Sequence, residues 1–199
     1  MKKTIIFVLV EPFADWEGAY LSSILLTLRH DQYEIRTMSL TREPIHSIGG
    51  FTVLPDYAVE DIPADFDGVI LIGGNAWRTE AAQAVQEVVR RALTEKKVLG
   101  AICDATVFLG AMGVLNNIRH TSNALPELKA WAKTAYTNET AYVDEPAVRD
   151  GKIITANGTA ALEFAREVLL ALDAAPAKQI LEWYEFFKKG IYQAPLPKL

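Results

Sequence analysis

The feature that most constrains the fold of this 199-residue chain is a repeated alternation of short apolar runs with helical apolar stripes. The run TIIFVLV at 4–10 is continuous, as a strand buried on both faces of a parallel sheet should be, and a helical stripe at 17–30 follows it. The same order returns with FDGVILIGG at 66–74 and a helical segment at 79–97. Strands that precede helices in this way predict parallel strands joined by helical crossovers.

The remaining segments extend this alternation, and no repeat or linker divides the chain. We therefore expect residues 1–199 to form one domain, a mostly parallel, flavodoxin-like three-layer α/β/α sandwich with helices on both faces of the sheet. The further elements are expected as a strand at 33–40, a hairpin outside the main sheet at 44–54, a short helix at 124–132, two short strands within 141–157, an amphipathic helix at 158–173 and a last helix at 176–190, started by Pro176 and stopped by Gly190.

The only cysteine, Cys103, stands where an apolar run gives way to a helical pattern. The stretch 98–102 predicts a buried strand, and apolar residues within 107–112 recur at helical spacing. A sulfur at such a turn lies near the free N–H groups and the positive dipole end of the helix, which favours the thiolate. A free cysteine is about as often a small buried core residue, so position alone leaves both interpretations open.

Two other segments end at the same predicted sheet edge, where ligands of parallel α/β sheets bind. Gly73 and Gly74 end a strand, and their backbone N–H groups could bind the oxygen of a substrate, or they could form an ordinary turn. Glu17 lies at the start of the first helix, where it could reach the cysteine or simply be a solvated carboxylate favoured by the helix dipole.

Taken together, FADWEGA, DFDGVILIGG, LGAICDAT, GVLNNIRHTSN and NGTAALEFAREVLLAL resemble the successive motifs of the PfpI-type superfamily, which includes peptidase-like proteins and the parkinsonism-associated deglycase. The resemblance covers about residues 3–173 and implies a fold shared with class I glutamine amidotransferases. It implies that Cys103 is the nucleophile at an elbow with strained backbone dihedrals and that Glu17 hydrogen-bonds its sulfur. A protonated Glu17 would then lower the pKa of the thiol below its reference of ~8.5.

The resemblance further implies an oxyanion site formed by Gly74 and the backbone N–H of Asp104, with Gly73 and Asn123 beside it. Two departures from the family pattern concern acid–base groups. Peptidase-like members have a histidine where this chain has Asp104, whose charge disfavours a thiolate. Other members supply a histidine at the position matched here by Asn123, and His120 lies three residues earlier as a candidate substitute.

Charge and histidine content exclude several other function classes. A formal charge of -5 without a Lys/Arg block argues against nucleic acid, and no run is long enough for a membrane span. An unpaired cysteine and the absence of a signal-peptide pattern predict a cytoplasmic protein. His30 and His46 have no ligand spacing, so no metal or other cofactor is expected.

The sequence therefore predicts a cysteine-dependent hydrolase of peptidase, amidase, deglycase or glyoxalase type that acts on a small-molecule or peptide substrate. It is not expected to be a glutamine amidotransferase, because no late His-Glu pair completes that triad. The alternative is a non-enzymatic redox or stress-response protein in which Cys103 is oxidised, and a chain that only binds a ligand is a third possibility. The family resemblance and the aromatic segment WYEFF, with Trp183, Phe186 and Phe187, predict a homodimer.

Overall fold

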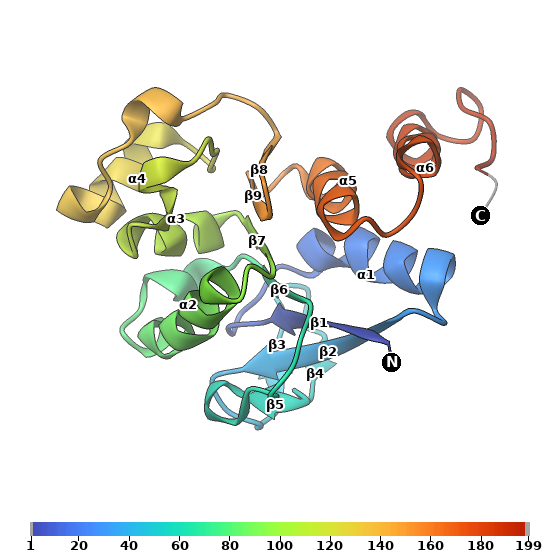
Figure 1. Cartoon of the computed structure of the whole chain (residues 1–199). Coiled ribbons are helices and arrows are strands. Elements are labelled where there is room, and N and C mark those ends of the chain that lie inside the picture. Colours follow the sequence, from blue (N-terminus) through green and yellow to red (C-terminus); the bar gives the residue numbers. More distant parts are fainter. Residues whose placement is uncertain (1, 198–199) are drawn as a thin grey trace.

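A computed structural model describes residues 2–197 and contains a seven-stranded sheet with helices on both faces (Figure 1). The strands are β1 Lys3–Val8, β2 Tyr33–Ser39, β3 Ile45–His46, β4 Thr52–Val53, β5 Tyr57–Ala58, β6 Gly68–Leu71, β7 Val98–Ile102, β8 Ala147–Asp150 and β9 Ile153–Ala156. The α-helices are α1 Asp15–Arg29, α2 Gln86–Thr94, α3 Asp104–Ala111, α4 Leu125–Ala132, α5 Ala161–Leu172 and α6 Ala177–Lys189. Short 3-10 turns span Val59–Asp61, Asn75–Arg78, Ala81–Val85, Val114–Asn117, Lys133–Ala135 and Glu139–Ala141.

The strand order confirms the predicted fold class. The sheet runs β5-β2-β1-β6-β7-β9-β8, and every neighbouring pair is parallel except β8 with β9. Its five central strands follow the order 2-1-3-4-5 along the chain, which is the flavodoxin-like arrangement. The carboxyl ends of β1, β6 and β7 are therefore neighbours, and the segments that follow them meet at one edge of the sheet.

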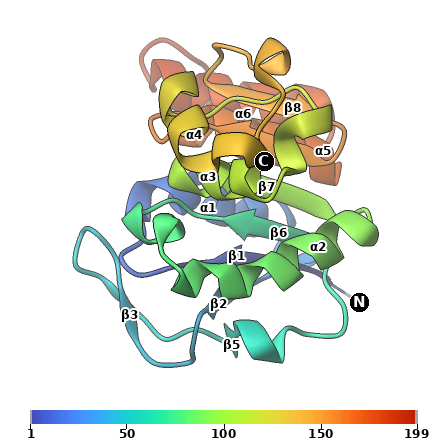
Figure 2. The same cartoon turned by 90° about the vertical axis from the view of Figure 1, so that its left-hand side faces the viewer.

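Two apolar cores lie on opposite faces of this sheet. One core packs α1 and α5 against the strands, with α6 on the outside of α5, and the other packs α2 and α3, with α4 next to α3. Figure 2 shows α2 crossing the near face of the sheet in that view. The continuous apolar runs of β6 and β7 are buried throughout because both faces of each strand are covered.

Several predicted elements have different bounds in the structure. The helix predicted over 79–97 is α-helical only in part: residues 81–85 form a 3-10 turn, and α2 runs from Gln86 to Thr94. Thr79, the first residue of the predicted helix, donates a hydrogen bond from Oγ1 back to the carbonyl of Ala76. The predicted hairpin is confirmed as the separate antiparallel pair of β3 and β4.

The last helix begins after Pro176 and ends before Gly190, as predicted, and one of its aromatic side chains, Trp183, is buried against its own chain. Trp183 is 2% exposed within the core beneath α6, whereas Phe187 remains 46% exposed. Glu163 of α5 holds the helix in place by accepting hydrogen bonds from Lys188 Nζ at 2.7 Å and Tyr184 Oη at 2.9 Å. The aromatic segment WYEFF was one argument for a homodimer. Trp183 cannot contribute to such a contact, because it is buried within its own chain.

Candidate active site

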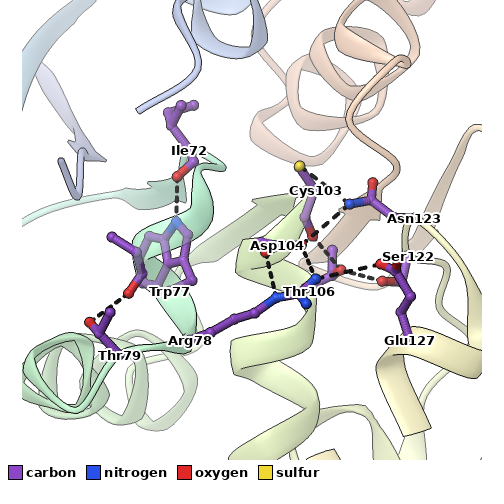
Figure 3. Close-up of polar contacts among 11 residues, drawn as sticks. Ile72, Trp77, Arg78, Thr79, Cys103, Asp104, Thr106, Ser122, Asn123 and Glu127 are labelled. Atoms are coloured by element: carbon purple, nitrogen blue, oxygen red, sulfur yellow. Dashed lines mark hydrogen bonds and ion pairs between the residues drawn. The ribbon is translucent and has the colours of Figure 1, made fainter. Parts of the chain in front are cut away.

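Cys103 occupies a sharp turn between β7 and α3. Its φ of 59° and ψ of -132° lie in a region that side chains other than glycine rarely adopt, which confirms the predicted strained elbow. Hydrogen bonds hold this conformation from both sides: the Cys103 N–H donates to Ala156 at 3.0 Å, and Thr106 Oγ1 donates to the Cys103 carbonyl at 2.6 Å. Ser122 contacts the same threonine hydroxyl at 2.7 Å, so the loop before α4 is tied to the elbow (Figure 3).

Glu17 is brought from the first turn of α1 into the interior beside this cysteine, where it is fully buried. One carboxyl oxygen, Oε2, accepts a hydrogen bond from the Gly73 N–H at 2.7 Å. The other, Oε1, has no hydrogen-bond partner among residues 2–197 and lies near the Cys103 sulfur, next to Gly158. A Cβ atom on Gly158 would lie 2.9 Å from the sulfur and 3.2 Å from Oε1, so only a glycine leaves the space between them open.

The acid–base properties of this pair differ from the sequence expectation. Burial raises the pKa of Glu17 to about 7, although the Gly73 N–H and the Cys103 thiol oppose the rise. Burial, followed by the negative charge of Glu17, raises the pKa of the Cys103 thiol to about 11. Hydrogen bonds from Asn123 and the Asp104 backbone lower it by less. The expected thiol pKa below ~8.5 is therefore wrong, because desolvation outweighs the short helix that follows the cysteine.

The two glycines that end β6 have different roles. The Gly73 N–H is occupied by Glu17, so Gly73 does not belong to an oxyanion site and instead orients the carboxyl. Gly74 has a φ of 149°, and a Cβ there would collide with the Pro12 carbonyl. The geometry thus requires glycine at position 74. The N–H groups of Gly74 and Asp104 remain the predicted donors to an oxyanion.

Asp104, the residue expected to repel a thiolate, is 5% exposed and paired with a cation that the sequence analysis missed. Arg78 Nε donates to Asp104 Oδ2 at 2.6 Å, and Arg78 Nη2 donates to Oδ1 at 2.8 Å (Figure 3). Arg78 follows the GGNAW segment at the edge where Asp104 begins its helix. Opposite charges after neighbouring parallel strands were the signal that could have identified the pair.

Asn123 contacts the sulfur of Cys103. In the sequence comparison above, this residue matches the position at which other members of the family supply a histidine. Its Nδ2 donates to Cys103 Sγ at 3.3 Å and to Asp104 Oδ1 at 3.4 Å, while its Oδ1 accepts the Gly158 N–H at 2.8 Å. The Gly158 contact fixes the orientation of the amide, because a flipped amide would turn its oxygen towards the Asp104 carboxylate.

His120 is not brought to the thiol, which corrects its selection as a catalytic candidate. It is fully buried, with Nε2 2.7 Å from the Tyr136 hydroxyl and Nδ1 2.9 Å from the Ile118 carbonyl oxygen. Both ring nitrogens are thus occupied, and burial lowers the pKa of the imidazole. We interpret His120 as a packing residue of the segment before α4.

The described residues contain no cluster of three or more His, Cys, Asp or Glu side chains suited to a metal ion. His46 lies in the hairpin and contacts Glu11 at 2.8 Å through Nδ1. The reactive groups that the fold brings together at the elbow are the Cys103 thiol, the buried Glu17 carboxyl and the Asn123 N–H donor.

Comparison with known proteins shows the family to which the chain belongs. Residues 3–171 match the DJ-1/PfpI family. The chain is 35% identical over 193 residues to the uncharacterized protease YdeA of Bacillus subtilis, covering 96% of this chain and 94% of that protein. The deglycase PfpI of Pyrococcus furiosus is 28% identical over 120 residues, 59% of this chain and 70% of that one. The crystal structure of a ThiJ/PfpI family protein from Bacillus anthracis, 32% identical, has a TM-score of 0.88 over 94% of this chain and 91% of that one. Because the family match extends from β1 to the end of α5, the chain belongs to the DJ-1/PfpI family.

Proposed function

We propose that this protein is a cysteine-dependent hydrolase of protease or deglycase type that acts on small electrophilic carbonyl compounds, with Cys103 as the nucleophile. The observation that carries the proposal is the thiol at a strained elbow, beside a fully buried carboxyl of which one oxygen has no hydrogen-bond partner in the part of the chain that the structure describes. Relatives named as a protease and as a deglycase support the same class of reaction.

The raised pKa values assign the proton transfer. At neutral pH a thiol with a pKa of about 11 is protonated, whereas a carboxyl with a pKa of about 7 is ionised in about half of the molecules. Glu17 therefore acts as the base that removes the thiol proton while a bond forms between Sγ and the carbonyl carbon. The C=O π electrons move to the oxygen, which the N–H groups of Gly74 and Asp104 stabilise before Glu17 returns the proton. The product of this step is a thiohemiacetal for an aldehyde or a tetrahedral adduct for an amide.

The same pKa values disfavour the alternative role as a redox sensor. Oxidation by peroxide requires an exposed thiolate, and sensor cysteines have a low pKa. Cys103 is only partly exposed, and burial raises the pKa of its thiol. A base that removes the proton during attack suits this thiol better than a permanent thiolate does.

The test is turnover of methylglyoxal and of a panel of amides and peptides by the wild type, Cys103→Ala and Glu17→Gln. Turnover that disappears in Cys103→Ala and falls at least about tenfold in Glu17→Gln supports the proposal. Glu163→Gln, which changes a buried carboxyl that faces α6 instead of the thiol, serves as the matched control. Absence of turnover together with rapid peroxide oxidation of Cys103 would support the redox role instead. Absence of turnover together with a thiol that peroxide does not oxidise would contradict both.

The predictions about assembly and location remain predictions. No helix within residues 2–197 has the length and apolar character needed to cross a membrane. A homodimer would cover the exposed Phe187, which packs edge-on against Tyr20 with ring centroids 5.6 Å apart. We expect a dimeric mass in solution and a cytoplasmic location, and a monomer at micromolar concentration would contradict the first.

A further inference from the structure

Asp104 presents an electrostatic problem beside the proposed nucleophile. It directly follows Cys103, it is almost fully buried, and its carboxylate lies one amide group away from the sulfur. A buried carboxylate without a cation is costly, and a second negative charge near the sulfur opposes formation of the thiolate. The site therefore needs a group that neutralises Asp104 without occupying the thiol.

Arg78 meets this need with two donors of its guanidinium, the N–H groups of Nε and Nη2. The two hydrogen bonds to Asp104, at 2.6 and 2.8 Å, form a bidentate pair in which each carboxylate oxygen has its own donor. Such a pair fixes the direction of the carboxylate as well as its charge. The Oδ1 atom is thereby held where it also accepts a hydrogen bond from Asn123 Nδ2.

The position of Arg78 is itself fixed by the surrounding structure. The 3-10 turn Asn75–Arg78 is anchored by Trp77, whose Nε1 donates to the Ile72 carbonyl at 2.6 Å (Figure 3). The guanidinium carbon lies 4.8 Å from the centre of the Trp131 ring, and Nη2 is 3.5 Å from Glu127 of α4. The Asp104 and Glu127 carboxylates thus engage Nε and Nη2, and the Trp131 ring lies against the guanidinium, so these contacts hold the group in place.

We propose that Arg78 is a positioning residue for the nucleophile, acting on the sulfur through Asp104 and Asn123. It cancels the charge of Asp104 and holds that carboxylate so that the Asn123 amide directs an N–H to Cys103 Sγ. This network replaces the histidine of other family patterns with a donor that does not titrate. The inference rests on the proposed function, since it assigns Arg78 a role in preparing Cys103 for attack.

The network makes a specific statement about pH. The charged groups around the sulfur are Glu17 from α1 and Asp104 from α3, with Arg78 from the 3-10 turn and Glu127 from α4 on the far side of Asp104. With Arg78 in place, the reactivity of the thiol depends on the ionisation of Glu17 and Cys103. Without Arg78, the uncompensated charge of Asp104 shifts the whole profile to higher pH.

The test is the rate at which iodoacetamide alkylates Cys103 across a pH range, followed by mass spectrometry. Iodoacetamide is neutral, and Cys103 is the only cysteine, so the rate reports this thiol alone. We expect Arg78→Met to slow alkylation near neutral pH at least about tenfold and to shift the profile by about one pH unit or more. Adding Asp104→Asn to Arg78→Met should restore the rate to within about threefold of Asp104→Asn alone, because the charge to be neutralised is gone.

Arg42→Met is the matched control, since Arg42 pairs with Asp61 at 3.0 Å on the surface, and it should leave the profile unchanged. A folded Arg78→Met protein with the wild-type profile would overturn the inference, as would a double variant that stays as slow as Arg78→Met. If Arg78→Met does not fold, Arg78→Lys retains the charge without the bidentate geometry. It should alkylate several-fold more slowly than the wild type, and Asp104→Asn should abolish that difference; a wild-type profile for Arg78→Lys would again overturn the inference.

This experiment separates the inference from the proposed function, because alkylation requires no substrate. If the wild type turns over no carbonyl compound, the proposed function fails while the effect of Arg78 on the thiol can still be observed. If turnover is found but Arg78→Met has no effect on the alkylation profile, the function stands and the positioning role is lost.

Discussion

Replacing Glu17 by glutamine should make Cys103 more reactive towards a small alkylating agent while reducing turnover. A Cβ atom added to Gly158 would lie 2.9 Å from Cys103 Sγ and 3.2 Å from Glu17 Oε1. The sulfur and this carboxyl oxygen are therefore at most about 6 Å apart. At that distance and an effective dielectric constant of about 20, their repulsion is about 3 kcal/mol. Removing the charge should therefore lower the pKa of the thiol by about 2, from about 11 towards about 9.

The shape of the pH profile distinguishes the two proteins. In the wild type, Glu17 and Cys103 titrate as a coupled pair, and above about pH 7 a roughly constant ~1% of molecules carry the proton on Glu17 and the charge on sulfur. Alkylation should thus rise to about pH 7, level off, and rise again only as the second proton leaves. Glu17→Gln should show one rise centred near pH ~9 and should react about tenfold faster than the wild type near pH ~8.

Alkylation by iodoacetamide, counted by mass on the single cysteine, measures both profiles. Glu163→Gln should reproduce the wild-type curve, because that carboxyl faces Lys188 and Tyr184. Should Glu17→Gln react at the wild-type rate or more slowly throughout, the charge of Glu17 does not act on the sulfur. The raised pKa of the thiol would then need another origin.

Three further changes test other parts of the site. Burial raises the pKa of Glu17 from 4.5 to about 7, so between these pH values the folded state keeps a proton that the unfolded state has released. The free energy of unfolding of the wild type should therefore fall by about 3 kcal/mol as the pH rises through this window. Urea unfolding should show this loss in the wild type and not in Glu17→Gln. Cys103→Gly should be more stable than Cys103→Ala by about 1 kcal/mol in the same assay, because only glycine relieves the φ of 59°, and equal stability would argue against backbone strain. Gly158→Ala places a Cβ 2.9 Å from the sulfur, so both alkylation and turnover should fall at least about tenfold in a folded protein, whereas Gly151→Ala, whose Cβ would meet nothing within 4 Å, should leave the rates unchanged.

The sequence by itself determined the sheet, the hairpin and the elbow. Strands such as β6 and β7 can be recognised in the sequence because a strand buried on both faces is apolar along its whole length. The turn at Cys103 can be predicted because the apolar pattern changes from that of a strand to that of a helix within a few residues. The 3-10 turn before α2 was missed, since helical apolar spacing over 79–97 does not distinguish an α-helix from a 3-10 turn followed by a shorter α-helix.

The tertiary structure decided the chemistry of the site. It brought Arg78 to Asp104 and Asn123 to the sulfur, turned Gly73 towards Glu17, and kept His120 away. It also reversed the expected direction of the thiol pKa. Local patterns depend on backbone sterics and on periodic burial, which neighbouring residues specify. The charge state of a buried pair depends on desolvation and on distances between groups far apart in the chain, and only the packed fold sets these.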